Sequence, residues 1–132
     1  MASRIGSGKR ARRGFTLIEL MVVLSVIALL LTVALPRYFA SLDRAKEAVL
    51  REDLNQMRDA IQRYQGDKGK YPETLETLAA EKYLRQVPVD PISESAASWT
   101  IVPPDDPQKG GVYDVRSGAP GVGQDGKPYA EW

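Results

Sequence analysis

Cysteine and histidine are both absent from the 132 residues of this chain. Without cysteine the chain has no disulfide bonds and no thiolate ligands for a metal, and without histidine it lacks the commonest general base and imidazole ligand. A glycine-rich phosphate-binding loop is missing as well. The usual nucleophile–base pairs are therefore excluded, and the protein is not expected to be an enzyme.

Positive charge is scarce beyond the start of the chain. The formal net charge is +1, but residues 14–132 carry 13 positive against 17 negative groups. Nucleic-acid-binding domains usually show a concentrated basic face, so a nucleic-acid partner is not expected. The basic stretch GKRARR directly precedes an apolar segment, where such clusters fix membrane topology. Five basic residues lie in this head: Arg4, Lys9, Arg10, Arg12 and Arg13.

Residues 15–35 form an apolar segment whose only charge is Glu19. As a helix, these residues would reach about 32 Å, roughly the thickness of the hydrocarbon core of a bilayer. The basic residues lie before the segment, so the positive-inside rule predicts a cytoplasmic N-terminus and a C-terminal part on the other side of the membrane.

Two ordinary interpretations of this segment leave Glu19 unexplained. A secretory signal peptide also has a basic head and an apolar middle, but LPRYFASLD after the segment contains no convincing small-x-small cleavage site. An uncleaved single-span anchor is the stronger alternative. In both, a carboxylate within the apolar region would cost up to about 3 kcal/mol without serving any purpose.

The stretch RRGFTLIEL resembles the processing site of type IV pilins and type II secretion pseudopilins. The resemblance implies that a prepilin peptidase cuts between Gly14 and Phe15 and methylates the new amine of Phe15. Residues 1–14 would then be a cleaved leader, residues 15–36 a transmembrane and filament-core helix, and residues 37–132 a periplasmic pilin-like domain.

The same resemblance gives Glu19 a function in assembly. In the family this glutamate engages the N-terminal amine of a neighbouring subunit, and a buried carboxylate is tolerable when it is paired with such a cation. Pro36 is a second assembly position implied by the family; the alternative is a simple kink where the helix leaves the membrane. This proline is expected to bend or locally open the helix, because it lacks an N–H and its ring clashes with the carbonyl four residues back.

An amphipathic helix is predicted over residues 37–65, and Gly66 is its expected stop. Two apolar stripes follow the helical period, and the pairs Glu47–Arg51 and Asp59–Arg63 are expected on a solvated face. The first stripe contains Tyr38, Leu42, Ala45 and Val49, and the second contains Leu50, Leu54, Met57, Ile61 and Tyr64.

The head, residues 66–132, is predicted to hold a short helix capped by Thr74 and a few short strands between prolines. The strand candidates are residues 99–102, 112–117 and 129–132. The expected fold class is α+β: a long N-terminal helical spine packed on a small head with a short helix and a short antiparallel sheet, as in pilins.

The segments GKYPETLETL, VPVDP and GGVYDVRSGAPG, together with the C-terminal DGKPYAEW, resemble the major pseudopilin of type II secretion systems. Members of this type often hold calcium in the C-terminal loop, and here Asp125, Glu131 and Ser117 are the side chains that could bind it. The alternative is that the glycines and Asp125-Gly126 of SGAPGVGQDGKPYAEW merely shape turns. No cofactor is required; calcium is the one candidate.

The resemblance therefore implies a structural subunit that leaves the inner membrane to build a periplasmic helical filament, which drives protein export across the outer membrane. Its implied partners are further copies of the chain, the prepilin peptidase, an inner-membrane assembly platform with its assembly ATPase, minor pseudopilins and an outer-membrane secretin. The alternative is a type IV pilin or a competence pseudopilin that forms a surface or DNA-uptake filament. A third class, a monomeric membrane-anchored enzyme, needs a polar site that the sequence does not offer.

Overall fold

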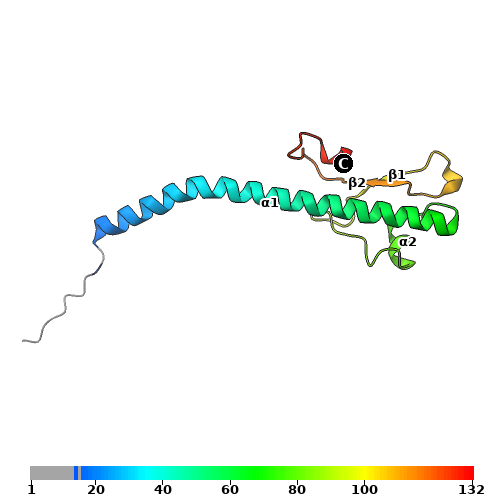
Figure 1. Cartoon of the computed structure of the whole chain (residues 1–132), viewed down its shortest axis with the longest axis horizontal. Coiled ribbons are helices and arrows are strands. Elements are labelled where there is room, and N and C mark those ends of the chain that lie inside the picture. Colours follow the sequence, from blue (N-terminus) through cyan, green and yellow to red (C-terminus); the bar gives the residue numbers. More distant parts are fainter. Residues whose placement is uncertain (1–13, 15) are drawn as a thin grey trace, which may run out of the picture. The chain divides into compact units, whose positions relative to one another are not determined.

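The computed structural model in Figure 1 describes Gly14 and residues 16–132. The elements, in order, are helix α1 (Leu17–Lys68), helix α2 (Leu75–Ala80), strand β1 (Thr100–Val102), the 3-10 helix η1 (Pro107–Lys109), strand β2 (Asp114–Arg116) and the 3-10 helix η2 (Tyr129–Glu131). β1 and β2 pair antiparallel, with Ile101 opposite Val115. One long helix with a small antiparallel sheet confirms the predicted α+β pilin-like fold.

The described residues divide into two compact units, one ending at Phe39 and one running from Ala40 to Trp132. In the first unit, the apolar side chains of α1 are exposed, from Leu17 at 74% to Leu35 at 45%. Its best 18-residue window has a mean hydropathy of 2.7, so by length and composition this part of α1 could cross a membrane. A single soluble molecule rarely exposes so large a continuous apolar surface, because water disfavours it.

Pro36 is predicted to bend the helix or to open it locally; of these two effects the local opening is not seen, since α1 is helical on both sides of this residue. Pro36 still removes one N–H from the helical ladder, which leaves the carbonyl of Thr32 without its usual donor. The neighbouring bonds are enough to keep this stretch helical.

The core of the second unit confirms one predicted stripe and not the other. The second stripe is buried: Leu50, Leu54, Met57, Ile61 and Tyr64 are each at most 6% exposed. They pack in one cluster with Leu75 and Leu78 of α2 and with residues from the strands and the C-terminal loop. In the first stripe, Val49 is 51% and Leu42 39% exposed, so the described head does not cover them.

Helix α2 and the β1–β2 pair lie on different sides of the C-terminal half of α1 (Figure 1). Thr74 caps α2 as predicted, because its side chain accepts from Thr77 N. Trp99 fixes the segment before β1, with its indole N–H donating to the carbonyl of Pro88 at 2.8 Å. The apolar stripe of α1 thus joins two short pieces that are far apart in sequence.

The predicted end of the helix at Gly66 is wrong by two residues. α1 continues to Lys68, and Gly69 takes the left-handed conformation, with φ of +74°, while its N–H donates to Gln65 O at 2.9 Å. Gly66 is tolerated within the helix because a single glycine costs only about 1 kcal/mol there.

The strand predicted over residues 129–132 is also wrong. Tyr129–Glu131 is the 3-10 helix η2, closed by Trp132 N donating to Tyr129 O at 3.1 Å. The two other strands are shorter than predicted, Thr100–Val102 and Asp114–Arg116. Gly118 lies so close to the carbonyl oxygen of Ser98 that a Cβ would overlap it, so β2 leads directly into a tightly packed crossing of two loops.

Candidate functional site

The predicted processing site lies at the very start of the described chain. Gly14 is exposed, and no other described atom comes within 4 Å of the position that a Cβ would take there. Packing against the described residues therefore does not require glycine at this position. Phe15 and leader residues 1–13 lie outside the described residues.

Glu19 is exposed in the first turn of α1. Its backbone N–H donates to Thr16 Oγ1 at 3.1 Å, and Leu20 N donates to Thr16 O at 3.1 Å, so Thr16 acts as the N-cap of the helix. Thr-x-x-Glu is the capping-box pattern, and a carboxylate in the first turn is favourable to the helix dipole. Glu19 therefore has a local structural reason to be present, in addition to the predicted function in assembly.

The structure does not bring together the three side chains named for calcium. Ser117 is fully buried, and its hydroxyl donates to Asp90 Oδ2 at 2.6 Å while accepting from Ala119 N at 3.1 Å. The other oxygen of Asp90 accepts from Ile92 N at 2.8 Å. Ser117 is thus committed to a buried bond that ties the end of β2 to the loop after Asp90.

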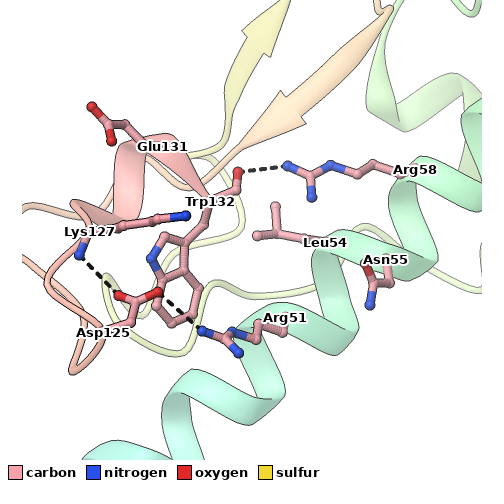
Figure 2. Close-up of a pocket in the computed structure, with 8 residues that line it drawn as sticks. All are labelled: Arg51, Leu54, Asn55, Arg58, Asp125, Lys127, Glu131 and Trp132. Carbon is pink, nitrogen blue, oxygen red and sulfur yellow. Dashed lines mark hydrogen bonds and ion pairs between the residues drawn. The ribbon is translucent and has the colours of Figure 1, made fainter.

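Asp125 and Glu131 are also in the wrong arrangement for calcium. Asp125 Oδ1 accepts from Lys127 N at 3.0 Å, and Oδ2 lies 3.4 Å from Arg51 Nη2. Figure 2 shows the carboxylates of Asp125 and Glu131 pointing in different directions. Among the described residues no group of three or more acidic side chains could hold a metal ion.

The two carboxylates line a pocket of about 240 Å³ that is unfavourable for a cation. Its other charged side chains are Arg51, Arg58 and Lys127, so cationic side chains outnumber the two acidic ones around the space. Calcium requires six to eight oxygen ligands at short range. The donor set and the charge of this pocket therefore do not fit calcium.

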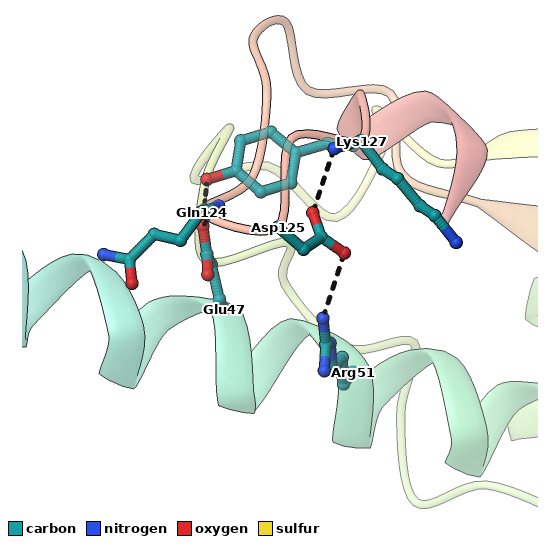
Figure 3. Close-up of polar contacts among 6 residues, drawn as sticks. Glu47, Arg51, Gln124, Asp125 and Lys127 are labelled. Atoms are coloured by element: carbon teal, nitrogen blue, oxygen red, sulfur yellow. Dashed lines mark hydrogen bonds and ion pairs between the residues drawn. The ribbon is translucent and has the colours of Figure 1, made fainter.

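Glu47 is a residue that the sequence analysis misjudged. The predicted surface pair with Arg51 does not form. Glu47 is only 8% exposed, and its Oε1 accepts from Gln124 N at 3.0 Å and from Tyr129 OH at 2.8 Å (Figure 3). Burial, the bond to Glu47 and nearby carboxylates raise the pKa of Tyr129 to about 12.

Arg58 makes a second set of contacts with the end of the chain. Its guanidinium lies 2.9 Å from Asp114 Oδ1 and donates to Val115 O at 3.0 Å and to Trp132 O at 2.7 Å. Asp114, the first residue of β2, is therefore ion-paired, and its side chain is only 28% exposed. Asp59 and Arg63 do form the predicted surface pair at 2.7 Å.

One sequence signal could have found these residues. Positions 44, 47, 51 and 58 of α1 are separated by three, four and seven residues, which places them along one side of a helix. This charged row runs alongside the buried stripe that includes Leu50, Leu54 and Met57. Polar residues bordering a buried stripe are candidates for contacts with whatever packs on it.

Comparisons with known proteins show which family the chain resembles. The family model described as the prokaryotic N-terminal methylation motif matches residues 9–35. The type II secretion system core protein G of Pseudomonas aeruginosa is 31% identical over 99 residues, which cover 63% of this chain and 70% of that protein. Core protein G of Klebsiella michiganensis is 29% identical over 136 residues, covering 91% of this chain and 89% of that protein.

A pilus protein is similar to the chain as well. The type IV wide pilus major component of Thermus thermophilus is 32% identical over 96 residues, which cover 70% of this chain and 73% of that protein. No solved structure matches the chain significantly. These relatives are structural subunits and not enzymes. The methylation motif, the uncovered apolar helix and the similarity over most of the chain lead to one conclusion: the chain belongs to the core protein G family of type II secretion systems, the major pseudopilins.

Proposed function

We propose that the chain is stored in the bacterial inner membrane and then polymerised into a periplasmic pseudopilus that drives export of proteins across the outer membrane. The observation that carries the proposal is the pairing of the motif GFTLIEL with a helix whose apolar side chains stay exposed within the described unit. Such a surface needs a bilayer first and other helices afterwards. The N-terminus would be cytoplasmic and the head, residues 37–132, periplasmic.

Processing would precede assembly. Prepilin peptidase would cut between Gly14 and Phe15 and methylate the amine of Phe15. Gly14 is exposed, and packing against the described residues does not require glycine there. A requirement for glycine would then lie in the active site of the peptidase, where a side chain at Gly14 would obstruct approach of the scissile bond.

Removal of the leader would create a cation at the start of the apolar helix. In the filament, Glu19 would accept that amine from an adjoining subunit, because a carboxylate and an ammonium are each costly alone in an apolar interior. Pro36, with its missing N–H, marks where α1 would open most readily during assembly. The assembly platform, its ATPase, minor pseudopilins and the secretin would supply energy, initiation and an exit route.

Two matched variants separate the assembly function of Glu19 from helix capping. Glu19→Gln keeps a side chain that suits a capping box but removes the charge, whereas Thr16→Ala removes the cap and keeps the charge. We expect Glu19→Gln to be inserted and cleaved after Gly14 but to form no filaments. Thr16→Ala should be cleaved and should still assemble.

The measurements are mass spectrometry of the native N-terminus and electron microscopy of sheared filaments. Mass spectrometry should find a methylated Phe15 in both variants. Two results would show that Glu19 supplies capping and not charge. One is normal filaments from Glu19→Gln, and the other is loss of filaments in Thr16→Ala but not in Glu19→Gln. A native chain that retains residues 1–14 in working filaments would refute the processing step.

A type IV pilin or competence pseudopilin is the second candidate, favoured by the Thermus thermophilus pilus relative and by a fimbrial protein of Eikenella corrodens that is 36% identical over 64 residues, covering 48% of this chain and 42% of that protein. Fibres on the cell surface, or retention of DNA by purified filaments, would favour this alternative. Filaments confined to the periplasm and loss of secreted protein on deletion would favour the pseudopilus.

A further inference from the structure

The C-terminal loop, residues 119–132, is fastened to α1 by side chains that the chain itself supplies. Arg44 Nε donates to Gln124 Oε1 at 3.0 Å, and Gln124 Nε2 donates to Ala40 O at 3.2 Å. Glu47 then holds the backbone of Gln124 and the hydroxyl of Tyr129. These contacts fix the first part of the loop along two turns of the helix.

The next turns of α1 hold the rest of the loop. Arg51 pairs with Asp125, and its guanidinium carbon lies 4.5 Å from the ring centroid of Trp132 (Figure 2). Trp132 in turn packs edge-on against Tyr129, with ring centroids 5.1 Å apart. Arg58 closes the series through its bond to Trp132 O. We call Arg44, Glu47, Arg51 and Arg58, with their partners in the loop, the clamp.

The three side chains named for calcium are not available together, and the clamp engages the one in the middle of the loop, Asp125. Both oxygens of Asp125 are engaged, one by the backbone N–H of Lys127 and one by a guanidinium (Figure 3). The hydroxyl of Ser117 belongs to Asp90, and Glu131 points elsewhere. A cation at Asp125 would have to displace Arg51 from both the carboxylate and the indole face, and would then meet Arg58 and Lys127.

We propose that this loop is held by the clamp in place of calcium, so that neither folding of the head nor its stability depends on the metal. The cation that neutralises Asp125 is covalently part of the chain and contributes packing as well as charge, since a guanidinium over an indole is itself attractive. The clamp lies within the folded head. The proposal therefore does not depend on which kind of filament the chain builds.

The first test compares thermal unfolding of the full chain, purified in detergent, in millimolar calcium chloride and in EDTA. Fluorescence of Trp99 and Trp132 reports on the head alone, because these are the two tryptophans of the chain. We expect the same midpoint in both solutions. A saturable rise of the midpoint with calcium would overturn the proposal, because a ligand that binds only the folded state must stabilise it.

Arg51→Gln gives a test whose sign differs between the two possibilities. If the clamp holds the loop, the variant loses the ion pair and the indole contact, and its midpoint falls by about 4–8 °C equally in calcium and in EDTA. If calcium holds the loop, removing a competing cation leaves the midpoint in calcium unchanged or higher than that of the natural chain. Either of these last results would overturn the proposal.

Arg63→Gln is the matched control. Arg63 lies on the same helix, its side chain is 68% exposed against 60% for Arg51, and it pairs with Asp59 four residues away. Such exposed pairs contribute only a few tenths of a kcal/mol. The midpoint should therefore fall less than half as far as in Arg51→Gln, and an equal fall would show that loss of any arginine from α1 produces the effect.

Discussion

The buried carboxylate of Glu47 offers a quantitative test of how the head is held together. Its Oε1 serves two donors, Gln124 N and Tyr129 OH, and the residue is 8% exposed. Glu47→Met has a side chain of similar length but no oxygen, so both donors lose their partner. Leaving a buried donor unsatisfied costs about 1–3 kcal/mol. Because Gln124 N is only partly buried, we expect losing both hydrogen bonds to lower the free energy of unfolding by about 2–4 kcal/mol.

Glu47→Gln is the matched control for this substitution. Its amide oxygen can still accept both hydrogen bonds, and only the additional strength of a charged acceptor is lost, about 1 kcal/mol. Because 1 kcal/mol lowers the midpoint of a 60–100-residue domain by about 4–8 °C, the two variants should be well separated in a thermal scan. Tryptophan fluorescence of the full chain in detergent is the assay.

Tyr129→Phe completes a double-mutant cycle. In the natural chain this substitution removes one hydrogen bond and should destabilise the head by about 1 kcal/mol. In the Glu47→Met background the hydroxyl has already lost its acceptor, so its removal should be neutral or stabilising. Additive effects of the two substitutions, or equal midpoints for Glu47→Met and Glu47→Gln, would refute the assignment of Glu47 as the buried acceptor.

Two further predictions concern pH and packing. The pKa of Tyr129 is raised to about 12 by burial and by its bond to Glu47, and the pKa of Tyr83 is raised to about 12 by its bond to Asp67 and by burial. Because the neutral form is favoured in the folded state, this stability is fully present below pH 10 and is lost as pH rises from about 10 to 12. Unfolding midpoints across this range should fall, and less steeply in Tyr129→Phe. Gly118→Ala should destabilise the head by about 1–3 kcal/mol, because the added Cβ would overlap the carbonyl of Ser98. Urea denaturation would measure this loss. An unchanged midpoint would contradict the close packing of the two loops.

The sequence by itself determined the features that depend on local order. The motif around Gly14 and Glu19 is linear: it lies within the contiguous residues 9–35 that match the methylation-motif family, so it can be recognised without the fold. The apolar segment of α1 follows from an unbroken run of side chains, and the buried stripe from Leu50 to Tyr64 follows from the helical period. The short helix after Thr74 is equally local, because an N-cap bonds only to the next few residues.

Only the tertiary structure decided what the charged side chains of α1 do. From the sequence, Glu47 and Arg51 are four residues apart and suggest a solvated pair. In the fold, Glu47 bonds to Tyr129, 82 residues away, and Arg51 pairs with Asp125, 74 residues away. A helical repeat shows which residues share a face, but it carries no information about which distant loop covers that face.

The C-terminal loop shows the same limit. Asp125, Glu131 and Ser117 are close in sequence and have the oxygen atoms that calcium binds, so a metal site was a reasonable prediction. Folding assigns each of them a different neighbour: Asp125 faces a guanidinium, Ser117 a buried carboxylate, and Glu131 points away from both. Residue types define which ligands are available, whereas convergence of their oxygens on one point depends on the path of the whole chain, and that path is set by packing against α1.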